Sequence, residues 1–226
     1  MLELSPNRFI TEKILLVRHG LTDWNKAHRF QGRTDVPLNE EGLAQAEKTA
    51  RRIEDWPVDA VYSSPLTRTR QTADVLAARH GKDVTIIDDL VEVYFGAWEG
   101  LYFKEKLKEK DGSLMNWFAD PFFNVPPGAE EWDSIKQRAE RAVNSVLQSG
   151  HKHVVIVSHG GIMRALLVVL LGFDPHTVWK IRSSNCSLTG IEIREYETSL
   201  AFANDDFHLK ENREGSNLLL WYNLAG

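Results

Sequence analysis

Two short apolar runs, each ending in a histidine followed by a glycine, constrain the fold of this chain most. Residues 13–18 (KILLVR) lead into His19 and Gly20, and residues 152–161 (KHVVIVSHGG) contain His159 and Gly160. Aliphatic runs bounded by glycine are typical of strands buried on both faces of a parallel sheet. If these strands are neighbours, the two histidines face each other at the carboxyl edge, where open α/β sheets bind ligands.

Strand-like and helix-like patterns alternate along the rest of the chain. Apolar residues recur at helical spacing after Asn39, a good capping residue, which predicts a helix over about 40–54. Further helices are expected over 65–80, 130–148 and 161–171, and strands over 58–64, 84–88, 187–196 and 199–204. This alternation predicts one α/β domain over residues 1–226, a three-layer sandwich whose mostly parallel central sheet has helices on both faces.

Residues 101–127 break the alternation and are interpreted as a lid-like insertion, part helix and part loop. A charged KEKLKEK segment comes first, with lysines that alternate with glutamates and are expected to face solvent. The insertion also carries the aromatic residues Tyr102, Phe103, Trp117, Phe118, Phe122 and Phe123. These rings either form a small satellite core or line a pocket that accepts an apolar or aromatic part of a substrate.

Composition and charge exclude several classes of function. The net charge of −5 argues against nucleic acid or an anionic membrane as the main partner. The most apolar stretch, residues 164–173, is too short to span a bilayer, and the first residues do not read as a signal peptide. The single cysteine, Cys186, excludes an internal disulfide. A cytoplasmic location is the expectation.

Arginines beside the two histidines indicate phosphate chemistry. Arg18 adjoins His19, and Arg68 begins a helix directly after the strand at 58–64. Guanidinium groups bind phosphate oxygens bidentately, and helix N-termini favour anions. Nearby positive charge also disfavours protonation of His19, so the imidazole stays neutral, as a nucleophile must. The alternative is that both histidines only cap turns and that Arg68 is a solvated helix residue.

The motifs together resemble the histidine phosphatase superfamily, in its phosphoglycerate mutase-like branch. The resemblance rests on RHGLTDWN (18–25), FQG (30–32), PLNEEGLAQA (37–46), SSPLTRTRQTA (63–73), FGAWEG (95–100), VSHGG (157–161) and NDDFHL (204–209). It implies that His19 becomes a phosphohistidine, while Arg18, Arg68 and His159 hold the phosphoryl oxygens. No metal or other cofactor is implied, because arginines supply the positive charge.

The same resemblance implies roles for five further residues. Glu92, four positions before Gly96, matches the general acid, in competition with Asp88, Asp89 and Glu99. Asn25, Gln31 and Gly32 match positions of the phosphate pocket, and the backbone amide of Gly160 matches a further contact. Without the resemblance, Asn25 and Gln31 are equally well explained as turn residues.

The substrate implied is a small phosphorylated metabolite, and three functions stay open: a phosphatase, a cofactor-dependent phosphoglycerate mutase and a non-catalytic phospho-ligand binding protein. Hydrolysis is favoured, because the insertion contains no arginine. Glu131 replaces a serine of the family pattern, and its charge would tune substrate entry if it faces the pocket. The tail 210–226 contains LLLWY, which fits an edge strand, a homodimer contact or core packing.

Other polar residues receive no catalytic role. Asn185 is expected in a turn, with an approach to the site as the alternative. His151 and His153 are expected on the surface at the opposite edge of the sheet. Nothing is assigned to Arg70 or to His28, His80 and His176.

Overall fold

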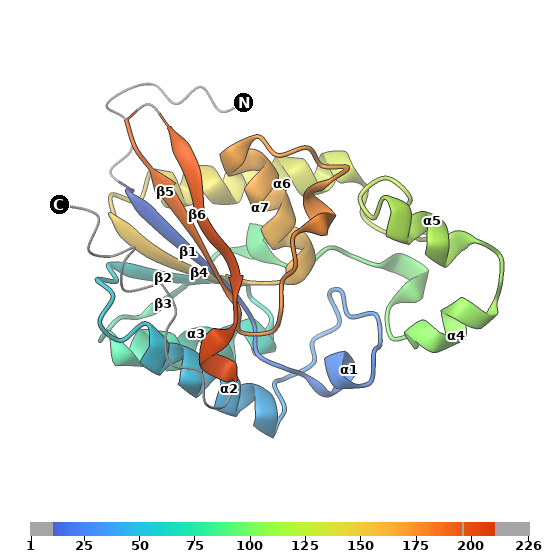
Figure 1. The fold of residues 1–226 in the computed structure, drawn as a ribbon, viewed down its shortest axis with the longest axis horizontal. Coiled ribbons are helices and arrows are strands. Elements are labelled where there is room, and N and C mark those ends of the chain that lie inside the picture. The colour runs from blue at the N-terminus through green and yellow to red at the C-terminus, as the bar shows by residue number, and fades with distance from the viewer. Residues whose placement is uncertain (1–10, 196, 211–226) are drawn as a thin grey trace.

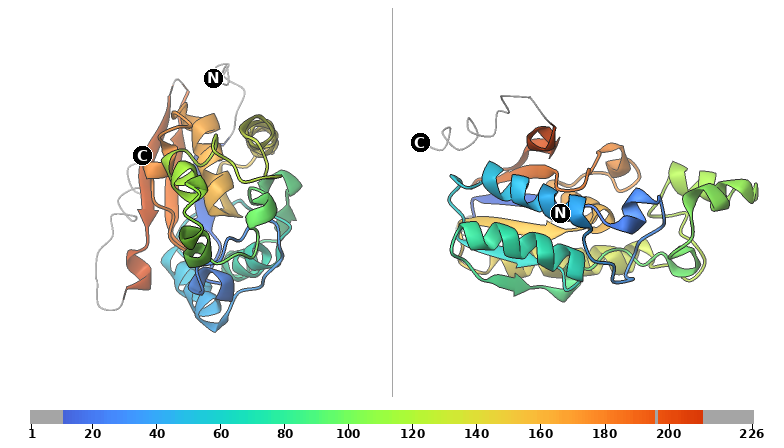
Figure 2. Two further views of the ribbon diagram at one scale, coloured as in Figure 1. Left: turned by 90° about the vertical axis from the view of Figure 1, so that its right-hand side faces the viewer. Right: turned by 90° about the horizontal axis from the view of Figure 1, so that it is seen from below.

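Six strands form a single sheet in the order β3-β2-β4-β1-β5-β6, with helices on both faces (Figures 1 and 2). This computed structural model describes residues 11–195 and 197–210. The reading of the first residues as lacking a signal peptide, and the expectations for the tail beyond Lys210, therefore lie outside the described residues. The predicted three-layer α/β arrangement is confirmed. No helix in the described ranges is long and apolar enough to cross a membrane.

The four strands on one side of the sheet are parallel, and the last two are antiparallel. β1 pairs with β4, β4 with β2 and β2 with β3 in parallel, whereas β5 runs against β1 and β6 against β5. The strands are β1 (Lys13–Arg18), β2 (Ala60–Ser63), β3 (Val84–Ile86), β4 (His153–Ser158), β5 (Leu188–Ile193) and β6 (Thr198–Asp205). The sheet is thus mostly parallel, as predicted.

Two hydrophobic clusters hold the helices on the sheet. On one face, α2 and α3 pack through Ala50, Ile53 and Leu76 on alternate residues of the strands. On the other face, α6 and α7 form the larger cluster. The helices are α1 (Asp23–Lys26), α2 (Glu40–Arg52), α3 (Thr67–Arg79), α4 (Phe103–Lys108), α5 (Ser113–Ala119), α6 (Trp132–Leu147) and α7 (Gly160–Leu171). Short 3-10 turns are η1 (Asp88–Leu90), η2 (Gly96–Trp98), η3 (Val178–Lys180) and η4 (Phe207–Leu209).

The register of the two central strands brings the two histidine motifs together. Arg18 is opposite Ser158 in the parallel pairing of β1 and β4, so His19 and His159 follow at the same level of the sheet. Both strands are almost completely buried, because they lie between neighbours and under helices on both faces. The prediction that these strands are adjacent is confirmed.

The segment 101–127 protrudes beyond the carboxyl edge of the sheet and contains α4 and α5 (Figure 1). It is joined to the loop after α1 by the bridge between Arg29 and Tyr102. The lysines of α4 were expected in solvent, which is wrong for Lys106. Its side chain is buried, pairs with Glu109 and Asp111, and its Nζ lies 5.1 Å from the ring centre of Trp98.

Candidate active site

His19 and His159 lie side by side at the carboxyl edge, with ring centres 5.2 Å apart. Both side chains are buried, at 3% and 0% exposed. Burial and the charges of Arg68 and Arg18 hold the pKa of His19 well below its usual value. The pKa of His159 is lowered in the same way, first by burial and then by Arg68. Both imidazoles are therefore neutral at ordinary pH, as expected for His19.

The backbone sets the tautomer of His19. Its Nδ1 lies 2.7 Å from the carbonyl oxygen of Gly20. A carbonyl only accepts hydrogen bonds, so Nδ1 carries the proton and Nε2 carries the free lone pair. This neutral tautomer presents a nucleophilic nitrogen on the side of the ring that faces away from the chain.

His159 is held between a hydroxyl and a guanidinium. Its Nε2 lies 2.8 Å from Ser64 Oγ, and its Nδ1 accepts a hydrogen bond from Arg68 Nε at 3.2 Å. Because Nδ1 accepts, Nε2 carries the proton and donates to Ser64. His159 therefore supports the position of Arg68.

Arg68, in the first turn of α3, is completely buried. Its two terminal nitrogens donate to the carbonyl oxygens of Thr34 (3.0 Å) and Gly32 (2.7 Å). Burial lowers the pKa of Arg68 to about 10, so the guanidinium is charged at neutral pH. The solvated-residue alternative for Arg68 is wrong.

The loop that holds Arg68 is fixed by Glu99. The carboxylate of Glu99 accepts hydrogen bonds from the amides of Arg33 (2.6 Å) and Thr34 (3.0 Å). A Cβ at Gly32 would lie 2.0 Å from Glu99 Oε1, so only glycine allows this close approach. Gly32 thus acts through its carbonyl on Arg68 and does not line the pocket.

Glu92 is positioned by the N-terminus of α7. Its carboxylate accepts hydrogen bonds from the amides of Val93 (2.8 Å), Gly161 (3.1 Å) and Ile162 (3.0 Å). Two of the competing carboxylates have other partners: Asp89 pairs with Arg141, and Glu99 holds the loop at 33–34. The third, Asp88, is exposed. Glu92 is the acidic residue of this group that lines the pocket.

Asn25 and Gln31 both line the pocket. The Gln31 amide lies 2.6 Å from Thr22 Oγ1 and 3.1 Å from Arg68 Nε, and both contacts are hydrogen bonds when its oxygen faces the guanidinium. Asn25 Oδ1 accepts from Asn185 Nδ2 at 3.2 Å, and the same nitrogen contacts the carbonyl of His19 at 3.0 Å. Asn185 lies in a turn, as expected, and these contacts also place it in the site, which was the alternative.

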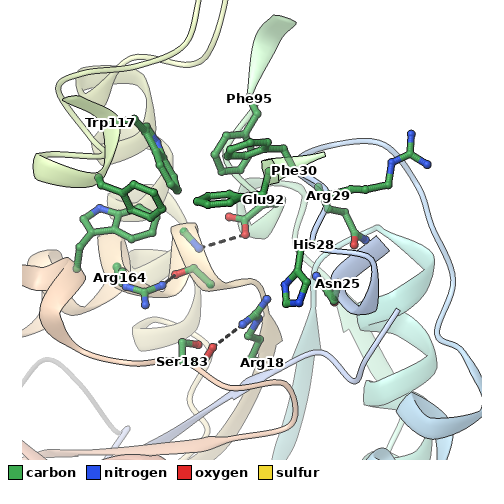
Figure 3. Close-up of a pocket in the computed structure, with 16 residues that line it drawn as sticks. Arg18, Asn25, His28, Arg29, Phe30, Glu92, Phe95, Trp117, Arg164 and Ser183 are labelled. Atoms are coloured by element: carbon green, nitrogen blue, oxygen red, sulfur yellow. Dashed lines mark hydrogen bonds between the residues drawn. The ribbon is translucent and has the colours of Figure 1, made fainter. Parts of the chain in front are cut away.

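A cavity of about 440 Å³ opens at this edge (Figure 3). Arg18, Glu92 and Gly160 line it together with Asn25 and Gln31. His19, Arg68 and His159 do not line it themselves. The two histidines are the chain neighbours of the lining residues Arg18 and Gly160, and Arg68 contacts the lining residue Gln31.

The aromatic residues of the insertion differ in their positions: Phe103 and Trp117 pack against a small cluster of Phe30, Trp98 and Leu114, which is the satellite core considered for them. Phe103, Trp117 and Phe118 line the cavity, and so do Phe30, Phe95 and Trp179 from outside the insertion. Phe122, in contrast, is 1% exposed and packs in the larger core cluster. Phe123 stacks on His176, with ring centres 4.1 Å apart, and Arg29 lies over the Tyr102 ring.

Several residues of the cavity wall were missed in the sequence, among them the polar residues Arg164, Ser183 and His28. Arg164 follows Gly160 by four positions on α7, and this helical spacing was a signal that could have revealed it. Ser183 and His28 lie in loops without such a signal. His151 and His153 lie at the opposite edge as expected, but they are half-buried. Glu131 is exposed at the start of α6 and does not line the cavity.

The described part of the chain holds no group of three or more His, Cys, Asp and Glu side chains arranged to bind a metal ion. Cys186 is buried, and burial raises the pKa of its thiol to about 12.

The model of the histidine phosphatase superfamily (branch 1) matches residues 14–206. The chain belongs to this superfamily. Phosphoserine phosphatase 1 from Hydrogenobacter thermophilus is 32% identical over 200 residues, which are 88% of this chain and 95% of that protein. The metal-independent phosphoserine phosphatase from Arabidopsis thaliana is 39% identical over 165 residues, 70% of this chain and 67% of that protein.

The structure of Bacillus stearothermophilus YhfR superimposes with a TM-score of 0.80 at 27% identity, covering 88% of this chain and 99% of YhfR. Proteins named as phosphoglycerate mutases or mutase-like also match. The histidine phosphatase assignment and the phosphoglycerate mutase-like fold are thus confirmed, but membership alone does not decide between hydrolysis and isomerisation.

Proposed function

We propose that this protein hydrolyses small phosphomonoesters through a phosphohistidine on His19. The observation that carries the proposal is the neutral imidazole of His19, whose Nδ1 proton is committed to the Gly20 carbonyl and whose Nε2 is free to attack. Arg18 and Arg68 supply two guanidinium groups next to it, since both act electrostatically on His19.

In the first step, His19 Nε2 attacks phosphorus and the bond to the ester oxygen breaks. Glu92, in its protonated form, gives its proton to the leaving oxygen. In the second step, Glu92 takes a proton from a water molecule that attacks phosphorus, the phosphorus–nitrogen bond breaks, and phosphate leaves. Arg18 and Arg68 hold the phosphoryl oxygens. His159 contributes by accepting from Arg68 Nε and so fixing its orientation.

The insertion, which contributes no arginine to the cavity, supports hydrolysis over isomerisation. A mutase has to hold a doubly phosphorylated intermediate, which requires additional cations over the site. The insertion instead contributes the rings of Phe103, Trp117 and Phe118. Apolar rings favour a single phosphate ester with an organic part that packs against them.

Substitution of His19 tests the chemistry. His19→Ala is expected to abolish turnover of p-nitrophenyl phosphate, and mass spectrometry of acid-free quenched wild-type enzyme is expected to find phosphate on His19. His80→Ala, a change of the same type in a histidine remote from the cavity, is the control. Full activity of His19→Ala would falsify the mechanism.

A second experiment separates the phosphatase from the mutase. The enzyme is incubated with 3-phosphoglycerate, with and without 2,3-bisphosphoglycerate, and phosphate and 2-phosphoglycerate are both measured. Phosphate release is expected. Isomerisation without phosphate release would instead establish the mutase.

A further inference from the structure

The chain just before Glu92 is held by a buried arginine. Arg138 in α6 is 4% exposed, and its Nη1 donates to the carbonyl oxygens of Asp89, at 2.9 Å, and of Val91. Two hydrogen bonds from one nitrogen of a planar guanidinium fix the direction in which the backbone enters Glu92.

A second arginine holds Glu92 itself, and Glu130 holds the chain after it. Arg33 Nε donates to the backbone carbonyl of Glu92 at 3.3 Å, and its guanidinium lies 5.9 Å from the ring centre of Tyr94. The carbonyl of Tyr94 accepts a hydrogen bond from the amide of Glu130 at 3.0 Å. The backbone is thus held on both sides of Glu92.

The carboxylate of Glu130 joins the two arginines. It accepts from Arg138 Nε and Nη2, each at 2.9 Å, and lies 3.0 Å from Arg33 Nη2. The side chains of Glu130 and Arg138 are 7% and 5% exposed, whereas that of Arg33 is 42% exposed. Burial by itself would raise the pKa of Glu130, but the hydrogen bonds and charge of Arg138 and the charge of Arg33 outweigh it and hold that pKa below its usual value. Glu130 is therefore ionised at neutral pH.

The same three side chains reach the loop that orients Arg68. Arg33 lies between Gly32 and Thr34, whose carbonyls accept hydrogen bonds from Arg68 at 2.7 and 3.0 Å. The side chain of Arg33 therefore ties the Glu92 segment to the loop that positions a guanidinium proposed to hold the phosphoryl group.

These contacts act from outside the cavity. Arg33, Glu130 and Arg138 are not among the described residues that line it, whereas the carboxylate of Glu92 points into it (Figure 3). Proton transfer requires a donor within hydrogen-bonding distance of the leaving oxygen, so a small displacement of Glu92 is enough to slow the reaction.

We propose that Arg138, Glu130 and Arg33 are positioning residues for Glu92, which fix its backbone so that its carboxyl group reaches the leaving oxygen. This inference rests on the proposed phosphatase function. It adds that the efficiency of proton transfer is set by an ion-pair network that does not touch the substrate.

Glu130→Gln tests the network through the leaving group. The change removes the charge that holds both guanidinium groups, so Glu92 is expected to lose its alignment. The value of kcat/KM should fall about 10- to 100-fold for benzyl phosphate, whose alkoxide needs a proton, but less than about threefold for p-nitrophenyl phosphate. Glu131→Gln, the same change at the adjacent exposed residue, is the control and should affect neither substrate.

A second variant keeps the test independent of folding. Removing one member of a buried ion pair destabilises a protein, whereas Arg33→Gln leaves the pair of Glu130 with Arg138 intact. This variant is expected to lower kcat/KM for benzyl phosphate by about 3- to 10-fold and to spare p-nitrophenyl phosphate. Arg70→Gln, an equal charge change at an exposed position of α3, is the control. Equal losses on both substrates in both variants would overturn the proposal, because they would reflect only a loss of folded enzyme.

A double-mutant cycle shows whether Glu130 acts through Glu92. In the Glu92→Gln background, Glu130→Gln is expected to lower kcat/KM for benzyl phosphate by less than about twofold, because no acid remains to be positioned. Losses that multiply in the double variant would show that Glu130 acts by another route and would overturn the proposal.

Hydrogen exchange separates this inference from the proposed function, because it needs no turnover. The amides of Gly161 and Ile162 donate to the carboxylate of Glu92, and Glu130→Gln is expected to speed their exchange by about tenfold or more. The amide of Met163, which donates to a backbone carbonyl, should exchange as before. If the exchange speeds up but no ester is hydrolysed, the phosphatase proposal fails and the network stands. If esters are hydrolysed and Glu130→Gln changes neither the exchange nor the two rates, the network fails alone.

Discussion

At the scale of single residues, the site is a set of groups whose protonation is set by their neighbours. His19 is kept neutral by burial and by two arginines, and one backbone carbonyl selects the nitrogen that can react. Glu92 is the proposed proton donor to the leaving oxygen. Three backbone amides hold its carboxylate at the start of α7. Its place in the cavity wall is what makes proton transfer to the substrate feasible.

Substitution of Glu92 is therefore expected to affect substrates according to their leaving groups. Glu92→Gln should reduce kcat for phosphoserine, whose alkoxide needs a proton, by about 100- to 10,000-fold. The phenolate of p-nitrophenyl phosphate leaves without a proton. For this substrate, the rate of the first step, phosphoryl transfer to His19, should therefore fall much less. Burst kinetics over a series of aryl and alkyl phosphates check this. Glu131→Gln, at an exposed position, is the matched control, and equal losses along the series would count against the acid role.

At the scale of elements, a half-buried histidine, His208, joins the end of the sheet to a helix. His208 in η4 contacts Thr49 in α2, with Nε2 2.9 Å from Oγ1. The Thr49 hydroxyl donates to the carbonyl of Gln45, so it accepts from His208, which must be protonated on Nε2. Burial lowers the pKa of His208 to about 4.

This shift predicts a loss of stability in mild acid. Since the folded pKa lies below that of the unfolded chain, near 6.5, the unfolded state binds more protons between these values. The stabilisation is complete above pH about 6.5 and is lost as pH falls towards about 4. Between pH about 7.5 and about 5, His208 should account for about 2 kcal/mol of the decrease in unfolding free energy. Urea unfolding at both pH values checks this, with His208→Gln expected to show a correspondingly smaller decrease; an identical decrease would contradict it.

At the scale of the whole molecule, positive charge is concentrated in a protein that is negative overall. The net charge is −5, yet Arg18, Arg68 and Arg164 lie together at one edge of the sheet. Each is anchored by backbone carbonyls. The proposed mechanism uses these guanidinium groups where many phosphoryl-transfer sites use magnesium.

Turnover is accordingly expected not to depend on a divalent metal. Dialysis against EDTA should leave kcat/KM for p-nitrophenyl phosphate within about twofold of the untreated enzyme, and added Mg²⁺ or Zn²⁺ should not increase it, because the arginines stabilise the charge. Metal analysis of the dialysed protein provides the control. An activity that is lost with EDTA and restored by one metal would refute metal independence.

The sequence alone determined the strands and the residues attached to their ends. Arg18, His19 and His159 could be found because each lies beside a buried apolar run and a glycine, and Arg68 because it begins a helix after a strand. Such features depend on local chain geometry, so spacing along the chain reveals them. The alternation of elements predicted the layers and the mostly parallel sheet for the same reason.

Only the tertiary structure decided which other groups meet at that edge. Arg164 and Ser183 reach the cavity because α7 packs against the loop at 181–183, and Trp117 lines it while Phe122, five residues later, is in the core. Asn185 contacts His19 across 166 positions of sequence. These contacts depend on packing between distant segments, which no local pattern records. The chemistry of His19 could thus be predicted from its neighbours along the chain, whereas the shape and charge that select its substrate come from neighbours in space.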